Sequence, residues 1–261
     1  MFLTVAGSPS FLATCLNIFT KYWPSLAFGI KNTLIIALSG TLIGLLLGLI
    51  VGGLRAIKVE KQAPLFIKVI KKIYDIIATI YIEVFRGTPM MVQAAFIYYA
   101  LLHVFNWSPN IAGIFVVSIN TGAYMSEIIR SGIQAVDPGQ VEGARSLGMS
   151  AIQTMKDVVL PQAIKNAFPA IGNEFIVNIK DSSVLSIISV TELMFQSKRI
   201  AGSNLKMMET YFVTATLYLC LTLACSIILR IIEHRLSNSN SSLPQSDTNV
   251  NSLKLTTRKD N

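Results

Sequence analysis

The stretch 33–54 contains no charged residue and is almost entirely apolar. Folded as a helix, a run of this length can cross the hydrocarbon core of a bilayer. The whole chain is 52% hydrophobic and only 14% charged, whereas soluble domains average about 25% charged residues. We therefore predict an all-α integral membrane protein.

Further apolar stretches give about five transmembrane helices in all. The expected spans are 30–54, 73–104, 111–129, 163–188 and 210–232. The second contains Glu83, Arg86 and Pro89, and the fourth contains Pro169. These residues interrupt the apolar pattern, so both spans are expected to be irregular.

The basic residues predict the orientation in the membrane. The net charge is +8, and Lys and Arg cluster over 55–72 and again after the last span. Cytoplasmic loops are enriched in Lys and Arg, which places both clusters and the C-terminus inside and the N-terminus outside. We expect an extracytoplasmic segment over 1–29, a transmembrane domain over 30–235 and a polar, disordered cytoplasmic tail over 236–261. Arginines are not interleaved with aromatic residues, so no nucleic-acid partner is expected.

The loop 137–161 is predicted to be a short helix, a glycine turn and a second helix. The first helix is about ten residues long, or roughly 15 Å, which is too short to span a bilayer. Each helix begins with an N-cap residue followed three residues later by a glutamine that can hydrogen-bond back to it. The first helix also has a proline in its first turn, a glycine forms the turn between the helices, and a proline marks the expected end of the second helix. In order, these residues are Asp137, Pro138, Gln140, Gly148, Ser150, Gln153 and Pro161.

This loop resembles the "EAA" loop of ABC transporter permeases. The matching residues are Glu142, Ala144, Gly148, Val158, Leu160 and Pro161. Gly143 departs from the pattern, which has Ala there. The resemblance implies a cytoplasmic coupling helix that docks on an ATPase subunit. The residues expected to serve this coupling are Val141, Glu142, Gly143, Ala144, Leu147, Gly148, Leu160 and Pro161.

Three more stretches resemble the polar amino-acid uptake permeases, the histidine, arginine, glutamine and cystine importers. They are EVFRGTPMMVQ (83–93), NTGAYMSE (120–127) and NIKDSS (178–183). The resemblance implies a type I ABC importer fold in the cytoplasmic (inner) membrane of a prokaryote. It also implies a second permease subunit, ABC ATPase subunits that bind ATP-Mg, and an extracytoplasmic solute-binding protein. The sequence lacks a G-x-x-x-x-G-K-[ST] phosphate loop, so we expect this chain itself to be non-catalytic and to bind no cofactor.

Polar residues inside the expected spans are candidates for the substrate path. Such residues usually face a bundle interior or a cavity. The set is Asn120, Glu127, Glu174, Asn178, Lys180, Asp181, Ser182 and Ser183. Two interpretations stay open for Lys180 and Asp181, which either meet a zwitterionic ligand or form a structural pair. Asn120 and Glu127 fit hydrogen bonds between helices better. No cluster of metal ligands is apparent, and no metal site is expected.

Two further alternatives stay open. A stand-alone secondary transporter or channel for small polar solutes would need an ion relay or paired broken helices, which the sequence does not clearly contain. Gly40, Gly44, Gly48 and Gly52 recur every four residues. Small residues at this spacing let another helix approach closely, either within the subunit or at a dimer interface.

Overall fold

The computed structural model describes residues 10–57, 59 and 62–238, and within these ranges it contains helices and no strand. Most of the segment 1–29 before the first span is described, but residues 1–9 are not. The expected tail lies outside the described residues except for 236–238. The elements are α1 (Phe11–Lys21), α2 (Trp23–Ala56), α3 (Leu65–Gly87), α4 (Met90–Phe105), α5 (Pro109–Gln134), α6 (Pro138–Ser146), α7 (Ala151–Gln153), the π-helical η1 (Thr154–Val159), α8 (Leu160–Asp181), the 3-10 helix η2 (Ser182–Ile188), α9 (Leu193–Asn204) and α10 (Met207–Asn238).

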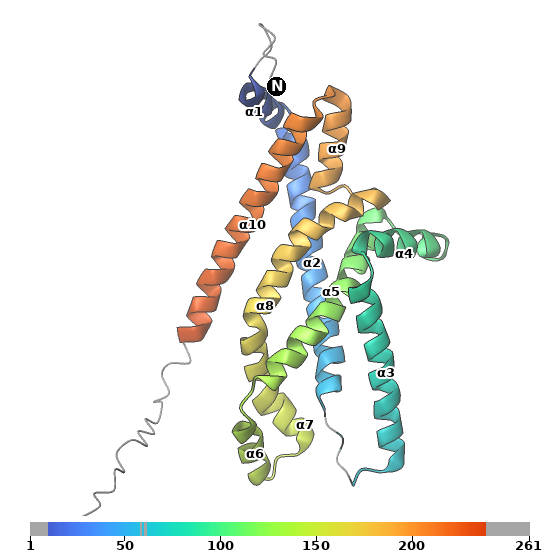
Figure 1. The fold of residues 1–261 in the computed structure, drawn as a ribbon, viewed down its shortest axis with the longest axis vertical. Coiled ribbons are helices and arrows are strands. Elements are labelled where there is room, and N and C mark those ends of the chain that lie inside the picture. The colour runs from blue at the N-terminus through green and yellow to red at the C-terminus, as the bar shows by residue number, and fades with distance from the viewer. Residues whose placement is uncertain (1–9, 58, 60–61, 239–261) are drawn as a thin grey trace, which may run out of the picture.

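Five long helices run along the long axis of the molecule (Figure 1). Of these, α2, α5 and α10 are long and apolar enough to cross a membrane by length and composition. The other two, α3 and α8, have 23 and 22 residues, and at 1.5 Å per residue they also match the bilayer core. Helices α1 and α9 lie at one end, and α6, α7, the C-terminal end of α2 and the start of α3 lie at the other (Figure 1).

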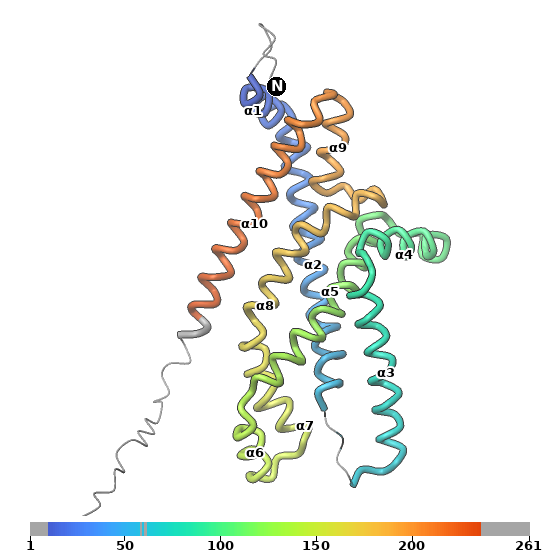
Figure 2. Tube along the Cα trace, viewed as in Figure 1, coloured from blue at the N-terminus to red at the C-terminus, as the bar shows by residue number. Residues whose placement is uncertain are grey.

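The expected second span, 73–104, is wrong as a single crossing. Helix α3 begins earlier, at Leu65, and ends at Gly87, after which α4 turns away from the long axis (Figure 2). Thr88 is extended, as a residue before proline prefers, and Pro89 supplies no N–H to continue the helix. The Gln93 amide then donates to the carbonyls of Phe85 and Thr88, each at 2.9 Å. The apolar run 90–104 is therefore a separate helix rather than the end of a span.

Two other span boundaries move. The first spanning helix starts at Trp23 rather than Ile30, because Pro24 occupies its first turn. The fourth span is α8 up to Asp181, and the remaining residues to Ile188 form the tighter helix η2. Pro169 lies within α8 without ending it.

The glycine stripe of α2 packs within the subunit, against α5. A Cβ atom on Gly44 would lie 2.8 Å from the side chain of Thr121, and one on Gly48 would overlap Met125. Both neighbours are fully buried residues of α5. The absence of side chains on α2 therefore sets how closely these two helices approach. This favours the first of the two alternatives drawn from the sequence.

The segment from η2 to α9 folds back onto the N-terminal parts of α2 and α10. Glu192, fully buried, caps α9 by accepting hydrogen bonds from the N–H groups of Met194 and Phe195. Its carboxylate also accepts from the Tyr218 hydroxyl of α10 at 2.7 Å. On the other side, the Asn32 amide of α2 donates to the Thr191 carbonyl at 2.8 Å. These bonds hold the end of the bundle that carries α1 and α9.

Candidate functional site: a helical hairpin and a central polar cluster

The hairpin of α6 and α7 forms as the loop signals predict, with one exception. Gly148 has φ +83°, the left-handed conformation that glycine adopts without strain. Ser150 and Gln153 complete a capping box at the start of α7. Asp137 caps α6 by accepting from the Gly139 N–H at 2.8 Å. The reciprocal bond expected from Gln140 is not among the contacts of this cap.

Helix α6 has one face turned to its own chain and one turned outward. Ala144 is buried, and Val141 packs against the small cluster of Val136 and Val159. Glu142 and Gly143 are exposed, and 86% of Leu147 is accessible at the tip. Of the residues expected to serve coupling, Ala144 therefore has its side chain turned toward its own chain. Glu142, Gly143 and Leu147 remain as the outward surface.

The second arm of the hairpin continues directly into the spanning helix. A π-helical stretch, η1, joins α7 to α8, so no loop separates the hairpin from the bundle. Pro161 is the second residue of α8 and directly follows the π-helical stretch, so its missing N–H removes one backbone hydrogen bond from the continuous helix at the point where the helix type changes. It is exposed, whereas Leu160 is half-buried. The break expected at Pro161 is thus a change of helix type rather than an end.

An ion-pair network lies between the hairpin and the bundle. Arg55, at the end of α2, lies 2.7 Å from a Glu127 carboxylate oxygen, and Arg130 lies 2.6 Å from the other. A cavity of about 510 Å³ beside them reaches Val141 and Glu142. Glu127 therefore lies at the hairpin end, where it joins α2 to α5. This placement bears out the expected hydrogen-bonding role between helices.

A second group of charged side chains lies further along the bundle, away from the hairpin. The Arg86 guanidinium, at the end of α3, lies 5.4 Å from the centre of the Tyr124 ring of α5. Glu174 and Asp181 both lie on α8 and are both half-buried. Three helices thus contribute one cation, two carboxylates and an aromatic ring to this part of the bundle. Such a mixed set suits a ligand that carries both charges.

Lys180 and Asp181 do not form an ion pair within 4.0 Å in the described part of the chain. Lys180 is exposed and Asp181 is half-buried. Ser183 is also half-buried, whereas Ser182 is buried and donates to the Ile179 carbonyl at 2.9 Å. The interpretation of Lys180 and Asp181 as a structural pair is therefore not supported by a direct ion pair between them.

Two asparagines of the expected path are instead buried between helices. Asn178 donates to the Thr41 hydroxyl of α2 at 2.8 Å and accepts from the Thr121 hydroxyl of α5 at 3.1 Å. Asn120 donates to the Gln93 side chain at 2.8 Å. Sequence reasoning did not single out Gln93 or Thr41. The only signal for Gln93 was its place at the end of the stretch 83–93, and Thr41 looks like any small residue of a span.

Replacing Asn178 with leucine is expected to lower stability moderately. The change removes two hydrogen bonds between helices, each contributing about 0.6 to 1.7 kcal/mol in a membrane, so the loss should be roughly 1–3 kcal/mol. Thermal unfolding of the purified variant in detergent would measure it. Asn173→Leu, on the exposed face of the same helix, is the control and should leave the midpoint unchanged. Equal midpoints for both variants would contradict the bridging role.

Comparison with known proteins decides the family. The family described as "binding-protein-dependent transport system inner membrane component" matches residues 63–238, more than half of the chain. The chain belongs to this family. By that description, its members are inner-membrane components of transport systems that depend on a binding protein. The match begins just before α3 and ends with α10, and so covers the hairpin and the charged group at Arg86.

Several binding-protein-dependent transport components are similar over nearly their whole length. The putative glutamine transport system permease protein GlnP of Rickettsia prowazekii is 36% identical over 219 residues, covering 83% of this chain and 96% of the relative. The glutamine transport system permease protein GlnP of Escherichia coli K12 is 36% identical over 220 residues, covering 82% and 95%.

Solved structures give the same fold. An amino acid ABC transporter crystallised with histidines matches with a TM-score of 0.74 and 38% identity, covering 87% of this chain and 99% of that one. The inward-facing MetNI methionine ABC transporter matches with a TM-score of 0.71 at 17% identity, covering 83% and 98%. The second likeness concerns the fold alone. The chain therefore has the type I ABC importer permease fold that its sequence motifs predict.

Proposed function

We propose that this chain is the permease subunit of an ATP-driven importer of polar L-amino acids. Relatives at 36% identity are named as glutamine transport permeases, and a solved neighbour at 38% identity is an amino acid ABC transporter. The charged group of Arg86, Glu174 and Asp181 supports the same substrate class, since it offers partners for both a carboxylate and an ammonium group. Lys180 and Ser183, the accessible residues nearby, complete the proposed path.

The observation that carries the proposal is the outward face of α6. Its tip holds Leu147 and, across the turn, Ile152, which are 86% and 73% exposed. Large apolar side chains beside a charged Glu142, at the end of a bundle, are typical of a docking surface. An ATPase subunit that binds ATP-Mg and docks on this face and on Ile152 would move η1 and α8 with it, because α7, η1 and α8 follow one another without a loop. The hairpin then biases the bundle between two states.

The remaining partners follow from the same assignment. Five spanning helices are few for enclosing a path, so a second permease subunit completes it, either identical or different. A solute-binding protein delivers substrate at the end that carries α1 and α9. The hairpin end, the basic stretch and the C-terminus are then cytoplasmic and the N-terminus is outside, in agreement with the charge distribution.

Reconstitution tests the proposal directly. The complex would be purified from its native membrane and placed in liposomes with ATP-Mg inside and labelled L-amino acids and the binding protein outside. Uptake of a polar L-amino acid that requires ATP is expected, and liposomes loaded with ADP are the control. A chain that purifies alone and transports without ATP would instead be a secondary carrier or channel.

A further inference from the structure

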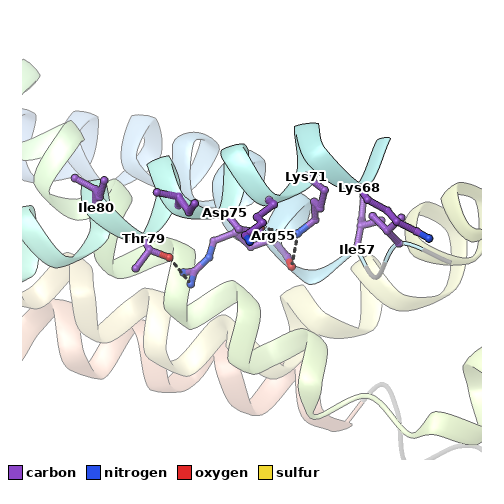
Figure 3. A pocket seen from close by; sticks show the side chains of 10 residues that line it. Arg55, Ile57, Lys68, Lys71, Asp75, Thr79 and Ile80 are labelled. Carbon is purple, nitrogen blue, oxygen red and sulfur yellow. Dashed lines mark hydrogen bonds and ion pairs between the residues drawn. The ribbon is translucent and has the colours of Figure 1, made fainter. Parts of the chain in front are cut away.

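A cavity of about 820 Å³ lies between the end of α2 and the first half of α3 (Figure 3). This volume is within the range of ligand sites in proteins. Of the residues that the structure describes, four cationic side chains and one carboxylate line it: Arg55, Lys68, Lys71, Lys72 and Asp75. The cavity is wide open to the outside, unlike the smaller one behind the hairpin. The charged side chains of the cavity are therefore accessible to molecules around this end of the bundle.

The contacts within the lining leave it with an excess of positive charge. Lys71 lies 2.5 and 2.7 Å from the two Asp75 carboxylate oxygens and also donates to the Arg55 carbonyl (Figure 3). The Asp75 carboxylate is therefore ion-paired with Lys71. The Arg55 side chain turns toward Glu127 and Thr79, at 2.7 and 3.3 Å. Lys68 and Lys72 add two positive charges to this arrangement, and Asp75 is the one acidic residue among the described residues of the lining.

Apolar side chains also line the cavity. Ile57, Ile76 and Ile80 are among them, and Ile76 and Ile80 are 52% and 58% exposed. They continue into Ile73 and Ile77, which are also exposed on α3. The lining thus combines basic side chains that suit an anion with apolar side chains that suit hydrocarbon. The basic residues lie in the first turns of α3, where an apolar helix meets a membrane surface.

We infer that this cavity holds the headgroup of an anionic phospholipid, with an acyl chain along Ile76 and Ile80. Clusters of basic residues beside a spanning helix attract anionic lipids, and basic pockets between helices hold their headgroups. A free phosphate ion would match the basic side chains but would leave the isoleucines in water, so the lipid accounts for both kinds of lining residue. The headgroup lies beside Arg55 and thus next to the ion pair that joins α2 to α5.

Lipid retention and stabilisation test this inference. The full-length chain in its complex would be delipidated in detergent and titrated with phosphatidylglycerol or phosphatidylcholine. Native mass spectrometry would measure bound lipid, and thermal unfolding would measure stabilisation. We expect retained phosphatidylglycerol and a rise in midpoint, with neither effect for phosphatidylcholine. In Lys68→Gln/Lys72→Gln the apparent affinity should fall roughly 30-fold, or about 2 kcal/mol, since each basic residue near the surface contributes about 1 kcal/mol.

A matched pair at the other end of the bundle controls for overall charge. Arg199→Gln/Lys206→Gln also removes two exposed cations, near and beyond the end of α9, and should keep the normal response. The single variant Lys72→Gln should show roughly a fivefold weakening, about 1 kcal/mol, and gives a second measure if the double variant is unstable. An equal loss in the control pair, or none in Lys68→Gln/Lys72→Gln, would overturn the site. Equal stabilisation by inorganic phosphate at the same concentration would overturn the lipid as its occupant.

Discussion

Leu147→Asp is expected to abolish ATP-driven uptake while the permease still folds and inserts. The side chain is 86% exposed at the tip of α6, so the substitution removes no packing within the chain. At the proposed ATPase interface, however, it would bury a carboxylate in an apolar contact, which costs far more than an exposed change. Central apolar contacts of this kind contribute about 2 kcal/mol or more, or roughly a 30-fold weakening of the ATPase subunit. Co-purification of the ATPase and uptake in membrane vesicles would measure both effects.

Leu147→Met is the matched control for this experiment. Methionine keeps the apolar surface and a similar volume, so both ATPase binding and uptake should stay close to normal. Normal uptake by Leu147→Asp, at normal levels of protein in the membrane, would show that the tip of α6 does not couple the two subunits. The docking surface would then have to lie elsewhere on the chain.

Gly48→Val should prevent stable folding, the second large effect that the structure predicts. The Cβ of any larger residue at this position would overlap the side chain and approach the backbone of Met125. Backbone atoms cannot swing away as the end of a side chain can, so α2 and α5 would have to separate. Overpacking typically costs 1–3 kcal/mol and more where the backbone must shift, so we expect at least about 3 kcal/mol. Folded yield by fluorescence size exclusion and the thermal midpoint would measure the loss.

Gly53→Val provides the comparison on the same helix. A Cβ at Gly53 would meet no atom within 4 Å. The change carries the same difference in helix propensity but no steric conflict, so folded yield should stay near normal. Equal midpoints for the two variants would mean that the stripe does not set the distance between α2 and α5.

Local signals in the sequence predicted the hairpin better than any other part of the fold. Asp137, Gly148 and Ser150 act through their own backbone and the next few residues, so their roles are written in the sequence itself. Gln153 reaches back as expected for the same reason. The bond expected from Gln140 is the exception. There the Asp137 carboxylate accepts from Gly139, one residue earlier than a capping box requires.

Contacts between distant residues could not be predicted in the same way. The turn between α3 and α4 depends on Gln93, whose partners include Asn120 of another helix. Because the residues after Pro89 are apolar, hydropathy alone led us to predict that they continue the span that begins before it. Asn178 looked like a path residue because polar groups in spans often are, yet Thr41 and Thr121 occupy its amide. The sequence identified the polar positions, but the neighbouring helices determine which of them face a ligand.

The π-helical stretch Thr154–Val159 sets the rotational phase between the hairpin and α8. A π-bulge accommodates one residue more than an α-helix would. Because each residue of an α-helix turns the chain by about 100°, a single residue of register decides the direction in which α6 points from the bundle. Val141 of α6 packs against the cluster of Val136, Val159 and Ala163. Losing the extra residue would therefore disturb this contact and turn the hairpin relative to the bundle.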